Sequence, residues 1–359
     1  MRDQGDPRQL SAVWRSGRVA TERIRCDRAV HLPLPVLFAT VSSWELAVEN
    51  LTSPMVLAFV LGAVAVMLRS DLRLPDPIHT WLSSYLLLAI GLKGGRALVG
   101  TEWVDIVVPA LATVGAGIIV PLIVFAVGVR VLRLRIPDAG SLAAHYGSVS
   151  VVTFTAAMVL ATESGLLADG FMTSLVALLE VPGIVVALLV VSRRQGGIEF
   201  GEALREVLAG RSVLLLLGGL VIGRVASDTS FAQVEPFFVT MFAGLLTLFL
   251  LDMGATVARR IRDSGWPSPR LAAFGIIAPI AFGGVGVLIG TGIGLEVGGA
   301  AVFGVMLASA SYIAAPAAMR TALPEANNEM ALVAALGVTF PFNLTVGIPL
   351  LFALATAVG

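Results

Sequence analysis

The sequence predicts an all-α integral membrane protein with ten transmembrane helices, arranged as two inverted repeats of five helices each. Three observations support this fold class. The 359 residues are 57% hydrophobic and 13% charged, with a mean hydropathy of +0.91, whereas soluble domains are about 45–50% apolar and about 25% charged. Clusters of charged and turn residues divide the apolar sequence into segments long enough to cross a bilayer, which takes about 20 residues. Short motifs also recur about 160 residues apart.

Ten apolar segments lie between polar clusters such as RSDLRLPDP and RRIRDSGWPSP. The first five predicted spans lie near residues 52–68, 77–93, 105–130, 140–162 and 168–192. The second five lie near residues 212–227, 233–254, 270–292, 298–321 and 329–357. Residues 193–211 form the longest polar stretch between spans and predict a short amphipathic helix with Phe200, Leu204 and Leu208 on one stripe.

The two halves, residues 51–192 and 212–359, resemble each other at matching places. SVSVVTFTAAM at 148–158 and SASYIAAPAAM at 309–319 agree at five of eleven positions, and EVP at 180–182 parallels TFP at 339–341. Because five spans is an odd number, the second half must enter the membrane in the opposite orientation. The sequence therefore predicts an inverted repeat, which is common among secondary transporters.

The distribution of basic residues predicts how the chain lies in the membrane. The odd-numbered loops hold 14 Lys and Arg residues, and the even-numbered loops hold 3. Basic loops stay in the cytoplasm, so we expect residues 193–211 inside and both termini outside a plasma (inner) membrane. Residues 1–50 carry seven arginines, a poor fit to an exported tail. We interpret them as a disordered extension or as the product of a start codon assigned too far upstream.

The duplicated serine motif is the best candidate for a binding site. A membrane helix can break only where protein or a water-filled cavity covers the break, and both motifs are small and rich in hydroxyl groups. Two half-helix N-termini meeting near the midplane would attract a small anion, and nearby carbonyl groups could hold sodium. The candidate substrate-binding residues are Ser148, Ser150, Thr153, Ser309, Ser311 and Tyr312. Close helix packing is the alternative for such small residues.

Three polar residues inside spans are candidates for sodium or proton coupling. Glu180 is the strongest, because an ionisable group within a span is costly and usually functional; capping of broken backbone at Pro182 is its alternative. Asn343 lies at the position that matches Glu180 in the second half. Asp252 is weaker, because Arg259 and the helix end lie near it. For His145 a packing role is favoured.

Other functions are disfavoured by what the sequence lacks. Its one cysteine, Cys26, cannot form an internal disulfide, and its three histidines are scattered. It has no phosphate-binding loop, HExxH or GxSxG motif with partners, so we expect no enzyme activity. We also expect no nucleic-acid partner and no cofactor, with sodium as the coupling ion.

Five motifs stand in order along the chain: SPMVLAF at 53–59, IGLKGG at 90–95, YGSVS at 146–150, EVPGIVVALLV at 180–190 and ASASYIAAPAAMRTALPEAN at 308–327. At these motifs the chain resembles the bacterial sodium-dependent bicarbonate transporter family, and the similarity runs from about residue 51 to residue 358. The resemblance implies sodium-driven bicarbonate uptake, a core domain and a gate domain each built from both repeats, and a homotrimer. It also implies a PII-like cytoplasmic regulator in some relatives, although the linker at 193–211 is short for the family.

The resemblance extends to individual residues. Ser150, Thr153, Ser309 and Ser311 match hydroxyl residues at the family's two helix breaks, and Glu180 stands where the family has an aspartate. The second break departs from the pattern, because Tyr312 replaces an aspartate. Further small or polar positions are also changed, at Val151, Val152, Ala314 and Ala315.

The sequence thus favours a sodium-coupled secondary transporter of a small anion, bicarbonate foremost, that works by alternating access. One alternative is a proton-coupled or exchange carrier of another small carboxylate, with Glu180 carrying the proton. The other is a non-transporting membrane sensor that signals through residues 193–211.

Overall fold

The computed structural model describes Val48 and residues 50–359, except for 71, 73, 167, 196–200, 202–204, 206 and 207. Every regular element in these ranges is helical, as the apolar segments predicted. The arginine-rich extension lies outside the described residues, as do Phe200 and Leu204 of the predicted linker helix.

Each predicted span coincides with one helix or with a run of short helices. The first half contains α2 (Pro54–Met67), α3 (Asp76–Ala97), α4 (Trp103–Arg130), α5 (Ile136–Gly147), α6 (Val151–Glu163) and α7 (Met172–Gln195). The second half begins with α9 (Arg211–Val225), α10 (Asp228–Glu235), η2 (Pro236–Thr240), α11 (Phe242–Ser264) and α12 (Pro269–Gly292). It continues with α13 (Val297–Ala308), α14 (Ala314–Ala322), α15 (Asn328–Leu332), η3 (Val333–Thr339), α16 (Phe340–Phe342), η4 (Asn343–Gly347) and α17 (Ile348–Val358).

Helices long and apolar enough to cross a membrane make up much of the structure. Among the described residues there are six, at 103–130, 136–163, 172–195, 228–263, 269–292 and 328–358, and α2 and α13 are shorter apolar helices. Large aliphatic side chains stay exposed along α4, as at Val104, Leu111 and Ile119. A multi-pass membrane protein accounts for these exposed side chains, because lipid tails then cover them.

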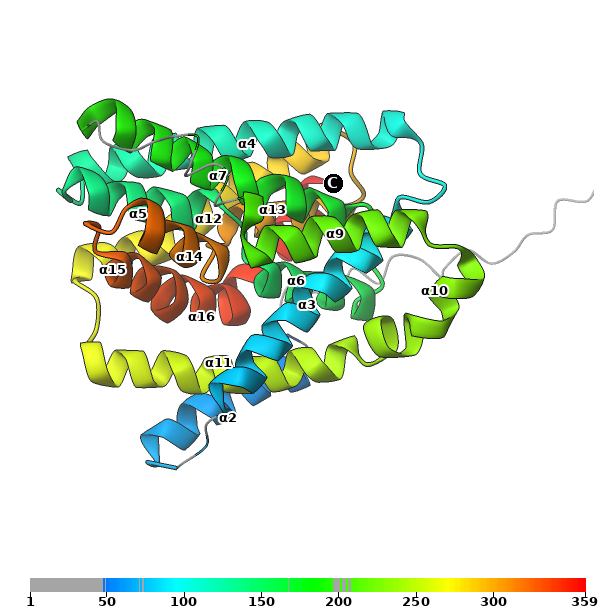
Figure 1. Cartoon of the computed structure of the whole chain (residues 1–359), viewed down its shortest axis with the longest axis horizontal. Coiled ribbons are helices and arrows are strands. Elements are labelled where there is room, and N and C mark those ends of the chain that lie inside the picture. The colour runs from blue at the N-terminus through cyan, green and yellow to red at the C-terminus, as the bar shows by residue number, and fades with distance from the viewer. Residues whose placement is uncertain are drawn as a thin grey trace, which may run out of the picture. The chain divides into compact units, whose positions relative to one another are not determined.

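One group of helices packs backbone to backbone. The helix α2 crosses α11 (Figure 1), and α3 packs on α9. A Cβ on Gly62 would lie 1.9 Å from the carbonyl oxygen of Leu251, and one on Gly95 would lie 2.0 Å from that of Leu220. Only glycine permits this approach, so small residues set these helix contacts, as is common between membrane helices.

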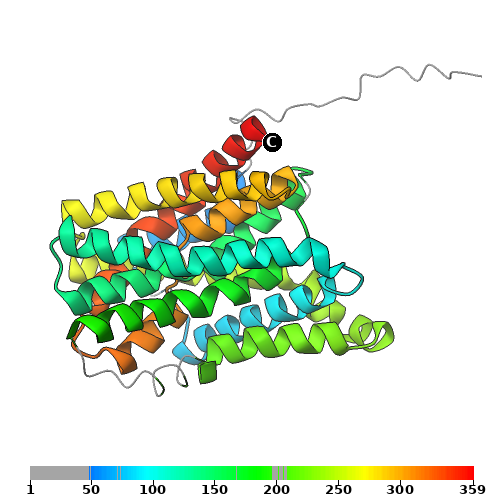
Figure 2. The same cartoon turned by 90° about the horizontal axis from the view of Figure 1, so that it is seen from above.

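The remaining long helices form a second group around the two interrupted spans. The helices α4, α5 and α7 pack on one another, and α12 packs on α13 and α17 (Figure 2). In the last span, α15 to α17, the helix widens into the π-helical segments η3 and η4 on either side of Pro341. Proline removes a backbone donor and crowds the preceding turn, and such π-segments often occur at functional sites.

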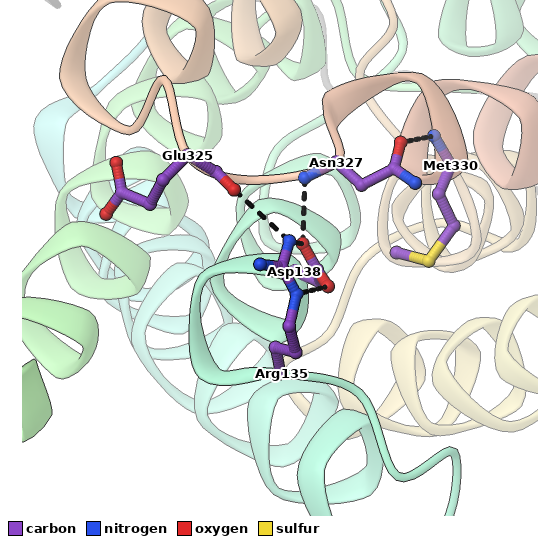
Figure 3. Close-up of polar contacts among 5 residues, drawn as sticks. All are labelled: Arg135, Asp138, Glu325, Asn327 and Met330. Atoms are coloured by element: carbon purple, nitrogen blue, oxygen red, sulfur yellow. Dashed lines mark hydrogen bonds and ion pairs between the residues drawn. The ribbon is translucent and has the colours of Figure 1, made fainter.

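A polar contact joins the start of α5 to the loop between α14 and α15 (Figure 3). Arg135 binds the Asp138 carboxylate in a bidentate pair at 2.8 and 2.9 Å. Asp138 also accepts the backbone amide of Asn327 at 2.8 Å, while the Asn327 side chain caps Met330 at 3.0 Å. Residues from the two halves of the sequence therefore fix the ends of both interrupted spans together.

Candidate functional site at the paired helix breaks

Both serine motifs interrupt a helix, as the sequence predicted. The span that begins with α5 loses helical structure at residues 148–150, and the span that begins with α13 loses it at 309–313. The chain resumes as α6 and α14, so two helix N-termini begin at the breaks. Each N-terminus carries unpaired amide groups and about half a positive charge.

Hydrogen bonds join the two breaks directly. The backbone amide of Ser150 donates to the Ser309 hydroxyl at 2.9 Å, and the amide of Ser311 donates to the carbonyl of His145 at 2.7 Å. Backbone groups released by the first interruption are thus paired by residues of the second. Because unpaired backbone groups in a membrane are costly, these two bonds explain how both breaks are tolerated.

Ser150 caps α6 and keeps its own hydrogen available. Its hydroxyl accepts the Thr153 amide at 3.1 Å and the Thr153 hydroxyl at 2.9 Å. These two bonds use both lone pairs of the Ser150 oxygen, so its proton can be donated elsewhere. The amides of residues 151 and 152 have no acceptor among the described residues. The N-terminus of α6 therefore offers several hydrogen-bond donors, namely the Ser150 hydroxyl group and the amides of residues 151 and 152.

Ser309 and Ser311 have a different role in this conformation. The Ser309 hydroxyl donates to the carbonyl of Met306 at 2.8 Å while it accepts from Ser150. Its single hydrogen is used, so Ser309 ties the breaks together. The Ser311 hydroxyl accepts the amide of Ala315 at 3.2 Å and so stabilises the first turn of α14.

Several polar atoms near the breaks are buried and have no hydrogen-bond partner. They include the hydroxyl groups of Ser148 and Tyr312 and the Nε2 atom of His145. The Tyr312 hydroxyl lies beside Ser150, and its ring packs edge-on against Phe340 at 5.2 Å. Because buried polar groups are nearly always paired, such orphaned atoms point to a missing ligand or water.

Glu180 lies on α7 next to the first break. Its side chain is 2% exposed, and its Oε2 atom has no hydrogen-bond partner. Gly183 follows one helical turn later, and a Cβ there would lie 1.9 Å from the carbonyl oxygen of Gly147. The face of α7 that carries Glu180 therefore presses on the C-terminal end of α5. A buried carboxylate on a helix that packs against the end of α5 offers oxygen ligands of the kind that a hard cation prefers.

The other two coupling candidates lie in different surroundings. The Asn343 amide donates to Ala308, the last residue of α13, at 2.8 Å, and its Oδ1 atom has no partner. It therefore lies at the second break, as Glu180 does at the first. Asp252 instead lies 2.7 Å from His79 and 3.8 Å from Arg259 in another cavity, so the structure does not bring it to the breaks.

Two residues near the breaks were not among the predicted site residues. The Tyr146 hydroxyl lies 2.6 Å from the Thr339 hydroxyl, which donates to the carbonyl of Gly275 at 2.7 Å. Through these bonds α5 is attached to the last span and to α12. The only sequence signal was the position of Tyr146 within YGSVS and of Thr339 beside Pro341.

Comparison with known proteins agrees with a membrane transporter. A family model described as "Na+-dependent bicarbonate transporter superfamily" matches residues 54–356, which is most of the chain. No curated protein sequence matches the chain.

Proposed function

We propose, since the chain belongs to the Na+-dependent bicarbonate transporter superfamily, that it is a sodium-coupled secondary transporter of a small anion. Bicarbonate is the first substrate to test, and the mechanism is alternating access. The observation that carries this proposal is the hydrogen bond that joins the two helix breaks, from the backbone amide of Ser150 to the hydroxyl group of Ser309. Membership of a transporter superfamily also argues against an enzyme.

The anion is assigned to the space between the two N-termini. The hydroxyl groups of Ser148, Ser150 and Tyr312 would donate to it, since those of Ser148 and Tyr312 are buried without a partner and the Ser150 oxygen accepts both of its hydrogen bonds to Thr153. The amides at the start of α6 would add to this attraction. Thr153, Ser309 and Ser311 would shape the site, because their hydroxyl groups already bind the protein.

Sodium is assigned to oxygen atoms that flank the same junction. Glu180 offers a carboxylate beside the end of α5, and Asn343 offers an unpaired amide oxygen beside the end of α13. A sodium ion at either place would offset the negative charge of the anion. Coupling would then follow because each ion stabilises binding of the other. Asp252 is assigned no part in this site.

The inverted repeat also remains a proposal, which the packing of the helices supports. The first predicted span (α2) packs on the seventh (α11), and the second (α3) packs on the sixth (α9). A two-fold relation between the halves generates this reciprocal pattern. We accordingly assign α2, α3, α9 and α11 to a gate domain and the interrupted spans to a core domain. From the resemblance we add a homotrimer and a PII-like partner at residues 193–211, and from the distribution of basic residues we add both termini outside.

One observation favours a second function, a proton-coupled or exchange carrier of another small carboxylate. Glu180 is buried and forms no ion pair with a described residue, and the second function takes its carboxyl group as the proton carrier. Tyr312 also leaves the second break without the aspartate that the resemblance leads one to expect. A carrier of this kind would follow a proton gradient.

Reconstituted protein would test both functions. Uptake of labelled bicarbonate into proteoliposomes is measured with an inward sodium gradient, with an inward proton gradient and with neither. We expect uptake only with the sodium gradient. Uptake that follows the proton gradient and ignores sodium would support the second function. Anion binding without uptake in any condition, from folded protein, would instead indicate the non-transporting sensor.

A further inference from the structure

A second cavity lies between α7, α9 and α14. Its volume is about 400 Å³. Its lining includes the start of α9, at Arg211 and Ser212, and Ile313 and Ala314 at the second helix break. Ala317 on α14 also lines the cavity and is exposed. The cavity therefore connects the first turn of α9 with the break.

The start of α9 has the features of an anion site. Gly210 provides no side-chain cap, and the amides of residues 211–213 have no acceptor among the described residues. The Ser212 side chain is 7% exposed and lines the cavity, and its hydroxyl group has no hydrogen-bond partner among the described residues. The exposed Arg211 adds a positive charge that no described carboxylate pairs. Helix dipole, hydroxyl group and guanidinium group thus converge on one space.

The position of the cavity suggests what this site is for. The helix α9 follows residues 193–211, which the distribution of basic residues predicts to be cytoplasmic. An anion leaving the paired breaks on this side would pass Ile313 and Ala314 and then meet Ser212. The small side chains of Ala314 and Ala317 leave room for it.

We propose that this cavity binds a small oxyanion between the N-terminus of α9 and the side of α14, on the path from the second break to the cytoplasm. This inference rests on the proposed function for the identity of the anion, which is the transported bicarbonate. A free cytoplasmic phosphate shares the same chemistry and is the other source to distinguish. The two residues that hold the anion are Arg211 and Ser212.

Protection of an introduced cysteine tests this site without a transport measurement. The one native cysteine is replaced (Cys26→Ser), and Ala317→Cys is added as a reporter in the cavity. The purified protein in nanodiscs is treated with a neutral maleimide, whose approach does not depend on the charge of Arg211. The rate of modification is measured at constant ionic strength in chloride, bicarbonate or phosphate. A cysteine outside the cavity, Arg262→Cys, reports any general effect of the anions.

Bicarbonate should slow modification of the reporter about 3-fold relative to chloride and leave the Arg262→Cys rate unchanged. Arg211→Gln and Ser212→Ala should each remove most of this protection. Arg224→Gln, which removes a charge at the other end of α9, should preserve it. Ser212→Thr, which keeps the hydroxyl group, should also preserve it.

Other results would overturn the proposal. Equal rates in all three anions, or protection that survives Arg211→Gln and Ser212→Ala, would mean that the cavity holds no oxyanion at these residues. Protection by phosphate alone would overturn the assignment to the transported anion. Because maleimide labelling needs no uptake, sodium-driven bicarbonate uptake without protection would leave the proposed function intact and reject this site alone.

Discussion

The backbone amide of Ser150 and the hydroxyl group of Ser309 lie 2.9 Å apart, although the two residues are 159 positions apart in the chain. This bond makes the two helix breaks one structural unit. The acceptor belongs to one half of the sequence and the donor to the other. Any change at Ser309 therefore alters the first break as well as the second.

Ser309→Ala should destabilise the protein by about 1–3 kcal/mol, because the buried amide of Ser150 loses its acceptor. Bicarbonate uptake should fall with it. Thermal unfolding of the purified protein and uptake by proteoliposomes measure the two effects. The control is Ser84→Ala, a half-buried serine whose hydroxyl bonds only within its own helix. Equal stability of the two variants would contradict the assigned role of Ser309.

Ser150→Ala should abolish uptake while the protein still folds and inserts into the membrane. The expected loss of stability is about 1 kcal/mol, the usual effect of removing an N-cap. Ser311→Ala should act in the same way on α14. Thr162→Val provides a control on α6, because Thr162 is exposed and bonds only to its own helix. Wild-type uptake by both serine variants would exclude the breaks as the binding site.

Tyr312→Phe should raise the KM for the transported anion about tenfold and leave stability nearly unchanged. The change removes a hydroxyl group that has no described partner, while the ring keeps its contact with Phe340. A hydrogen bond to a charged ligand contributes about 1.5–3 kcal/mol, which accounts for an effect of this size. Saturation curves for uptake give the KM. An unchanged KM would place the hydroxyl group of Tyr312 outside the site.

Glu180→Gln should remove the dependence of uptake on sodium. The amide keeps the size of the side chain and loses the negative charge that a cation requires. The measurement is uptake over a series of sodium concentrations, with Glu163→Gln, at the end of α6, as the matched control. If the response of Glu180→Gln to sodium equals that of the wild type, another residue holds the cation.

Gly183→Ala should prevent folding or destabilise the protein by about 3 kcal/mol or more. The new methyl group would lie 1.9 Å from the carbonyl oxygen of Gly147, and backbone atoms cannot move aside as a flexible side chain does. Gly218→Ala is the control, because nothing lies within 4 Å of the added atom. Yield of folded protein by size-exclusion chromatography compares them. Similar yields would show that α7 and α5 are free to separate.

The sequence was sufficient to locate the helices and both interruptions. Charged clusters mark where a span must end, and a run such as SVSVV combines small residues with hydroxyl groups that disfavour an unbroken helix. It could not predict which hydroxyl hydrogen atoms are in use. Ser150 and Ser309 look equivalent in the motif, yet the Ser309 hydroxyl donates to the carbonyl of Met306, whereas the Ser150 hydroxyl accepts two hydrogen bonds from Thr153. That difference depends on contacts between distant parts of the chain.

Other features depend in the same way on three-dimensional packing. Asp252 and Glu180 both lie among apolar residues in the sequence. Only the folded chain shows that His79 lies beside Asp252. The bond from Tyr146 to Thr339 likewise joins residues that no local pattern connects. No local sequence pattern marked Arg211 and Ser212 as cavity-lining residues, because helices that are far apart in the sequence form the cavity.

The glycine contacts of α2 with α11 and of α3 with α9 have a mechanical consequence. Where a glycine of one helix touches a carbonyl oxygen of the next, as at Gly62 and Leu251 or at Gly95 and Leu220, no layer of side chains can shear. We therefore expect the two helices of each pair to move together as one rigid unit. In the proposed alternating-access cycle, relative movement is therefore expected where longer side chains meet, as at the ion pair between Arg260 and Glu329.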